Sequence, residues 1–197
     1  MADSKGPQGA TGGEDVTVDF ILEQGAALLR GYVIERLNID EPSRHVSLEL
    51  LGGRPDELQD PELKQLLKEL MKITVDLETN TELQRLIKRV PDKCSEDIFM
   101  KTAKNIFADG INWGRVLALF QMAYIFIAKA LATNDEETVR QIQRLFPQVI
   151  REHVFIWLIQ QGGWEEVITV VFPQWRTVAI VVSVALVAAV VYYRKTH

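Results

Sequence analysis

Apolar residues recur along most of this chain at the spacing of helices. In residues 63–77 they fall at intervals of three and four, which places them on one helical face opposite lysines and acidic residues. Asp60-Pro61 supplies an N-cap and a first-turn proline, so a four-turn helix is predicted to begin there. Such a helix could be a structural element or the ligand for a groove in another protein. The apolar residues of this stripe are Leu63, Leu66, Leu70, Ile73 and Leu77.

A second predicted helix is apolar on every side. It follows a capping residue, Asn112, and its most apolar part runs from Val116 to Ala132. A helix without a polar face must be surrounded by protein or by lipid. At about 17 residues this part lies at the short limit for crossing a bilayer. We expect it to be the central core helix at rest, and entry into a membrane in another state remains an alternative.

A third apolar segment lies near the C-terminus. Val178 to Tyr193 contains no charged side chain, and basic residues follow at Arg194 and Lys195. As a helix it would span about 24 Å at about 1.5 Å per residue, close to the thickness of a hydrocarbon core. We expect residues 173–197 to form a tail anchor. Its predicted membrane-contacting residues include Val178, Ile180, Val184, Leu186, Val190 and Tyr193.

The remaining segments complete a helical bundle over residues 16–172. Residues 1–15 are polar and glycine-rich and are predicted to be disordered. A helix with two glycines, Gly25 and Gly31, follows, and the glycines indicate close helix packing. Residues 38–59 read as a long loop. Because no alternating apolar pattern predicts a strand, the fold class is all-α: a helical bundle around a central hydrophobic helix, with a C-terminal transmembrane tail helix.

Local signals mark the other helix ends. Ser95 can cap a helix, Asn134 with Glu137 resembles a capping box, and a short helix is expected over residues 82–89. Pro147 should kink or end the helix that contains it, because proline lacks the backbone donor. Gly162-Gly163 should stop the helix before it.

Composition and charge exclude several function classes. The net charge of −5 comes without a basic stripe, so nucleic-acid binding is not expected. The single cysteine, Cys94, cannot form an internal disulfide and fits a reducing compartment. The three histidines are scattered, and no metal-ligand spacing, phosphate-binding loop or nucleophile motif is present. We therefore expect no enzyme activity, no metal and no cofactor.

Two motifs give the chain a resemblance to a known family. Asn112-Trp113-Gly114-Arg115, continuing to Leu119 and Phe120, resembles the first homology motif of the Bcl-two family of apoptosis regulators. The segment from Trp157 to Gly162-Gly163-Trp164 resembles the second. Residues 70–77 occupy the place of the third, the death-ligand helix, and residues 25–32 and 82–87 resemble the Bax-like, pore-forming branch. The resemblance covers nearly everything from residue 16 onward.

The third motif departs from the family pattern. The family has a Gly-Asp pair after the central apolar anchor, whereas Thr74-Val75 follows Ile73 here, and the acid arrives one place later as Asp76. A shift of one residue turns a side chain by about 100° around a helix. In the family this acid pairs with the first-motif arginine, here Arg115, so the departure weakens that pairing and adds bulk at a tight contact.

The resemblance implies a pro-apoptotic effector. In this interpretation the first-motif residues Asn112–Arg115, Leu119 and Phe120 line a groove. A death-ligand helix of a related member activates the chain, and residues 63–77 then pair between copies of the chain in a homo-oligomer. The protein would be cytoplasmic at rest and anchored by its tail in the mitochondrial outer membrane on activation, where it permeabilises the lipid bilayer. Pro-survival members would be further partners. Two alternatives remain: a pro-survival member that captures death-ligand helices, and a tail-anchored scaffold that forms no pore.

Overall fold

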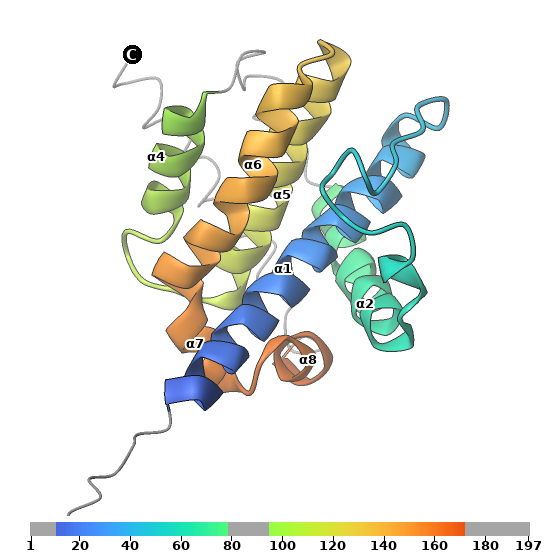
Figure 1. Ribbon diagram of the computed structural model, residues 1–197. Coiled ribbons are helices and arrows are strands. Elements are labelled where there is room, and N and C mark those ends of the chain that lie inside the picture. The colour runs from blue at the N-terminus through green and yellow to red at the C-terminus, as the bar shows by residue number, and fades with distance from the viewer. Residues whose placement is uncertain (1–10, 79–94, 172–197) are drawn as a thin grey trace, which may run out of the picture.

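The computed structural model describes residues 11–78 and 95–171 (Figure 1). These residues form helices and no strand, which confirms the predicted all-α class. The predicted helix of residues 82–89 and the tail anchor of residues 173–197, with its membrane-contacting side chains, lie outside the described residues. In chain order the elements are α1 (Thr11–Asp40), the 3₁₀ turn η1 (Glu57–Gln59), α2 (Pro61–Glu78), α4 (Glu96–Ile106), α5 (Trp113–Ala132), α6 (Glu136–Val149), the π-helical η2 (Ile150–Val154), α7 (Phe155–Gln161), α8 (Trp164–Glu166) and the π-helical η3 (Val167–Val171).

The first helix is longer than the sequence pattern predicts. It already includes residues 11–15, which were expected to be disordered, and it extends three residues into the expected loop of residues 38–59. Its last turn is held by a distant contact, since the Tyr124 hydroxyl on α5 donates to Asp40 Oδ2 at 2.5 Å. The same loop also contains the turn η1. The contact between Tyr124 and Asp40 therefore accompanies an extension of α1 beyond the end that the local sequence pattern predicts.

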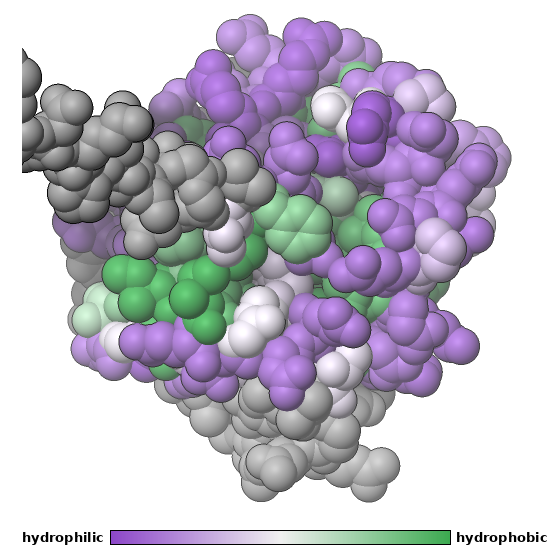
Figure 2. All heavy atoms as spheres, turned by 60° about the horizontal axis from the view of Figure 1, so that its bottom comes forward, coloured by the Kyte–Doolittle hydropathy of each residue, from purple (hydrophilic) through white to green (hydrophobic). Residues whose placement is uncertain are grey.

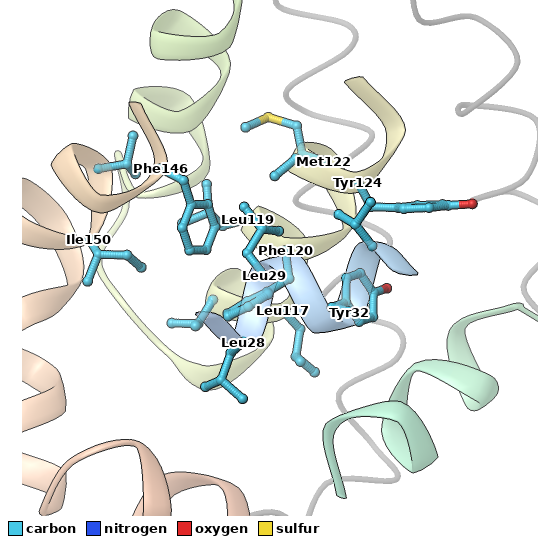
Figure 3. Close-up of a cluster of buried hydrophobic side chains, with 14 of the residues drawn as sticks. Leu28, Leu29, Tyr32, Leu117, Leu119, Phe120, Met122, Tyr124, Phe146 and Ile150 are labelled. Atoms are coloured by element: carbon cyan, nitrogen blue, oxygen red, sulfur yellow. The ribbon is translucent and has the colours of Figure 1, made fainter. Parts of the chain in front are cut away.

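The central position belongs to α5. It packs against α6, α1 and α4, which surround it in Figure 1. Figure 3 shows side chains of α5 meeting those of α1 and α6 in one apolar cluster. Phe120 lies at its centre, with ring centroids at 6.1 Å from Tyr32, 5.1 Å from Phe146 and 5.7 Å from Trp164, all edge-on. The prediction of a protein-enclosed core helix is confirmed for this state.

Most predicted helix caps are confirmed. Ser95 Oγ accepts the Ile98 N–H, and Asn112 Oδ1 accepts the Arg115 N–H at 3.0 Å. The predicted cap at Asn134 is wrong, because the cap of α6 is its neighbour Asp135, whose carboxylate accepts the Thr138 N–H. Asn134 adopts a φ of 55°, the left-handed geometry of a residue that ends the preceding turn.

The proline and the paired glycines act as predicted. Pro147 lies inside α6. Three residues later, at Ile150, the α-helix changes into the π-helical turn η2. Since proline removes one backbone bond, the wider turn accommodates the chain around it. Gly162, at a φ of 100°, ends α7, and its N–H bonds to the Ile159 carbonyl.

Candidate functional site

The predicted death-ligand stripe lies concealed on α2. Leu63, Leu66 and Leu70 are 7, 1 and 0 % exposed, and Ile73 is half-buried. The helix begins as predicted, because Asp60 Oδ1 accepts the N–H groups of Glu62 and Leu63 at 2.9 and 3.4 Å. The surface that would bind a groove is therefore turned into the protein. Asp76 and Leu77 lie in the last turn of α2, where the structure describes no side chains.

The seat for α2 is provided by α1. A β-carbon at Gly31 would approach Leu67 Cδ2 to 2.7 Å and Leu58 Cδ2 to 3.0 Å, so a larger residue there would force these leucine side chains to shift. At Gly25 a β-carbon would lie 3.0 Å from the Trp164 ring. Both glycines expected to mark close packing thus do so, one against α2 and the other against α8.

The first and second motifs meet through aromatic pairs. Trp113, at the start of α5, stacks on Trp157 of α7 with centroids 6.1 Å apart, and Phe120 meets Trp164 of α8. The Trp164 indole N–H also donates to the Ile21 carbonyl on α1 at 3.0 Å. Two motifs separated in sequence therefore form one structural unit with α1.

The first-motif residues are mainly core residues in this state. Trp113, Leu119 and Phe120 are fully buried and Gly114 is buried, whereas Asn112 and Arg115 are half-buried at the start of α5. Arg115 Nη1 donates to the Ile106 carbonyl at 2.8 Å and so fastens the end of α4 to the start of α5. A groove lined by this motif stays a prediction.

The second motif leaves apolar surface uncovered by the described residues. Ile156 is 71 % exposed and Ile159, one turn later on α7, is 43 % exposed. Figure 2, which brings the end of the molecule with α7 and α8 forward, shows a hydrophobic area within a mostly hydrophilic face. Exposed apolar surface of this kind is common where proteins meet partners or lipid.

A buried polar cluster joins α1, α2 and α5, and the sequence pattern did not identify it. The Tyr32 hydroxyl on α1 donates to Gln121 Oε1 on α5, and the side chain of Thr74 on α2 lies near enough to lower the Tyr32 pKa slightly against the effect of burial. Burial raises the pKa of Tyr32 well above 10, so the phenol stays neutral. Figure 3 shows the rings of Tyr32 and Tyr124 projecting to the same side.

The same cluster continues toward the end of α1. Arg36 Nη2 bonds to Asp40 Oδ2 at 3.3 Å, and its guanidinium carbon lies 5.3 Å from the centre of the Tyr124 ring. Burial, and then the hydrogen bond to Asp40, raise the pKa of Tyr124. The signal that could have located this cluster is the presence of Gln121 and Tyr124 within an otherwise apolar helix, because buried polar side chains require partners.

A second polar contact fixes the loop between α1 and α2. Arg30 Nε and Nη2 donate to the two carboxylate oxygens of Glu57 at 2.6 and 3.0 Å, and both side chains are largely buried. An open cavity of about 680 Å³ lies beside this pair, lined by α1, the loop and the start of α2. Neither residue carried a sequence signal, because a charged residue on a helix or in a loop is usually solvated.

These features define a class: a helical bundle that encloses an apolar, membrane-length helix and covers an amphipathic one. Among the described residues, α5 is the helix long and apolar enough to cross a membrane, yet 78 % of its most apolar window is buried. The family model for apoptosis regulator proteins of the Bcl-2 family matches residues 63–164. The chain belongs to the Bcl-2 family of apoptosis regulators, which are not enzymes.

Individual relatives agree with this assignment. The chain is 34 % identical to mouse "Apoptosis regulator BAX" over 98 % of both chains. It is 33 % identical to the human protein of the same name, over 93 % of this chain and 94 % of the other. The crystal structure of chicken BOK superposes with a TM-score of 0.64 at 21 % identity, covering 76 % of this chain and 96 % of that one.

Proposed function

We propose that this protein is a pro-apoptotic effector that permeabilises the mitochondrial outer membrane. In this proposal a death-ligand helix of a related family member activates the chain, α2 leaves its seat, and copies of the chain assemble in the membrane. The tail of residues 173–197 anchors the assembly. The observation that carries the proposal is the enclosure of α5, a 20-residue helix that is apolar on all sides yet covered by α1, α4 and α6.

The concealed state explains how such a protein would be controlled. Exposing α5 to water is costly at about 25 cal/mol per Å² of apolar surface, whereas transfer into lipid avoids this cost. An activator shifts the population only by binding the open state better than the closed one. Each tenfold preference is worth about 1.4 kcal/mol. The resting protein would thus stay cytoplasmic until an activator and a membrane are both present.

Dye release from vesicles tests this proposal. Purified full-length protein would be added to dye-filled liposomes with a synthetic death-ligand peptide from a related family member. We expect release that needs both protein and peptide. A Cys94→Ser background carrying Phe126→Cys, with an environment-sensitive dye on the new cysteine, should report entry of α5 into lipid as release begins. Phe126 is 3 % exposed at rest, so its label starts in the protein core.

The sequence departure at Thr74-Val75 favours a second candidate, a pro-survival member that captures death-ligand helices. That protein would bind the peptide and protect liposomes against a known effector without releasing dye itself. A scaffold would do neither, and its Phe126→Cys label would remain in a protein environment after peptide addition. Release without any change at the Phe126→Cys label would contradict the proposed mechanism, even though the effector class would stand.

A further inference from the structure

The ion pair between Arg30 and Glu57 joins two units that the proposed function separates. Arg30 lies on α1, whereas Glu57 lies in η1, which packs against α2. The next residue along the chain from Glu57 is Leu58, which packs against the Gly31 site, and Asp60 caps α2. The turn η1 and the start of α2 therefore form one continuous body that docks on α1.

The geometry of the pair is that of a built contact. The two nitrogen–oxygen distances are 2.6 and 3.0 Å, which gives the parallel, two-point arrangement that guanidinium and carboxylate groups favour. The Glu57 side chain is 6 % exposed and that of Arg30 is 15 % exposed. Glu57 Oε2 also accepts the Arg54 N–H at 3.3 Å, so the loop backbone contributes to its position.

The loop backbone encloses the pair closely. A β-carbon at Gly53 would lie 2.6 Å from Glu57 Oε1 and 2.7 Å from Arg30 Nε, so a side chain there would force the pair apart. Gly53 itself is fixed, because its N–H bonds to the Leu48 carbonyl at 2.8 Å. The loop therefore contacts α1 through the ion pair, and the absence of a side chain at Gly53 leaves room for that contact.

A buried ion pair is a better switch than a source of stability. Desolvation of the two charges offsets much of their attraction, but removal of one partner leaves a buried charge without compensation. The apolar attraction that holds α2 is non-directional, whereas the two-point pair has one geometry. When η1 moves away, both charges return to water, and their hydration replaces much of the attraction that is lost. Such a contact makes opening a single step.

We propose that the Arg30–Glu57 pair is an autoinhibitory clasp that holds η1 and α2 on α1 and keeps the death-ligand face closed. Its breakage releases α2 while α5, α6 and α1 remain assembled. The regulatory consequence rests on the proposed function: the clasp sets the activator concentration at which the protein opens. Whether the clasp holds α2 closed can be tested on the protein in solution, without membranes.

Hydrogen exchange of the full-length protein tests the clasp directly. Glu57→Gln keeps the shape of the side chain and removes its charge, and Arg30→Glu reverses the other partner. We expect the backbone amides of residues 63–74 to exchange at least about tenfold faster in Arg30→Glu, with a smaller rise in Glu57→Gln, while those of α5 keep their protection. The double variant Arg30→Glu/Glu57→Arg should recover part of the protection.

A matched control is the exposed pair on α6. Arg140 Nη2 lies 3.1 Å from Glu136 Oε2, and the two side chains are 65 and 58 % exposed. Arg140→Glu should therefore leave exchange of α2 unchanged. Unchanged exchange of α2 in both clasp variants, or an equal rise in α2 and α5, overturns the clasp. Arg30→Glu is the variant at risk of misfolding, and Glu57→Gln then carries the test.

Dye release separates the clasp from the proposed function. Glu57→Gln should lower the peptide concentration for half-maximal release by about three- to tenfold, and Arg140→Glu should not. Faster exchange of α2 with an unchanged release threshold overturns the regulatory role. If the wild-type protein releases no dye with any peptide, the proposed function fails, and the exchange result alone decides whether the clasp closes α2.

Discussion

Two helices of this protein, α5 and α2, are both covered by protein but in different ways. α5 is surrounded by α1, α4 and α6 and has no face that suits water, whereas α2 covers one apolar face on α1 and leaves a polar face in solvent (Figure 1). α5 can leave only for another apolar environment. α2 can leave for a groove of similar shape. In the proposed mechanism, this difference favours an order of events in which α2 opens first and α5 follows into lipid.

The centre of the α5 packing should show the largest effect. Phe120→Ala removes the ring that contacts α1, α6 and α8, and we expect a loss of about 3–5 kcal/mol in the free energy of unfolding, measured by urea denaturation. Phe20→Ala, where the ring is 59 % exposed, should cost less than about 0.5 kcal/mol. Equal costs at the two sites would contradict the central role of α5.

The seat of α2 should respond to added bulk. Gly31→Val places methyl groups against Leu67 and Leu58, and we expect a loss of about 1–3 kcal/mol with preferential loosening of α2. Ala27→Val, one turn earlier on α1, faces the open cavity and has room for its methyl groups. A comparable loss for Ala27→Val would mean that helix propensity, not contact with α2, explains the effect.

The tyrosines that join α1 to α5 should make the fold sensitive to alkali. Their pKa values are raised in the folded protein, so unfolding releases protons above pH 10, and stability present below pH 10 is lost as pH rises. At pH 10.5 we expect a loss of about 1 kcal/mol for each tyrosine relative to pH 8. Tyr32→Phe and Tyr124→Phe should each abolish the loss of about 1 kcal/mol that comes from the replaced tyrosine. A pH dependence identical to that of the wild type in both variants would exclude these phenols as its source.

The smallest expected effect distinguishes two buried threonines. Thr74→Val removes a buried hydroxyl that bonds to the Met71 carbonyl within α2 and lies near Tyr32 of α1, and we expect a loss of about 1 kcal/mol. The hydroxyl of Thr102 donates to the Ile98 carbonyl of its own helix, and Thr102 is 8 % exposed against 1 % for Thr74, so Thr102→Val should cost less. Urea denaturation of both variants provides the comparison, and the reverse order would argue against a role of Thr74 in seating α2.

The sequence predicted the features that depend on local chemistry. Ser95 and Asn112 cap helices because a short polar side chain next to a helix start can accept a free N–H, and neighbours in sequence suffice to show this. The apolar periodicity identified the buried face of α2 and the enclosure of α5 for the same reason. At Asn134 two adjacent residues could both cap, and backbone geometry selected Asp135.

The sequence could not predict contacts between distant residues. Helical periodicity shows which face is buried but not which element covers it, so the pairs Arg30–Glu57 and Trp164–Ile21 carried no signal. The first motif illustrates the same limit. The family resemblance implies a groove at this motif, which stays a prediction, and in this state Trp113 and Phe120 pack in the core, because the same apolar side chains suit either environment.

The indole of Trp164 has a consequence for the order of synthesis. It fills the space at Gly25 and bonds to Ile21, so α1 completes its packing only against a residue made more than a hundred positions later. On the ribosome, α1 emerges long before this partner exists. The nascent chain can therefore complete this packing only after nearly all of the described bundle has been translated.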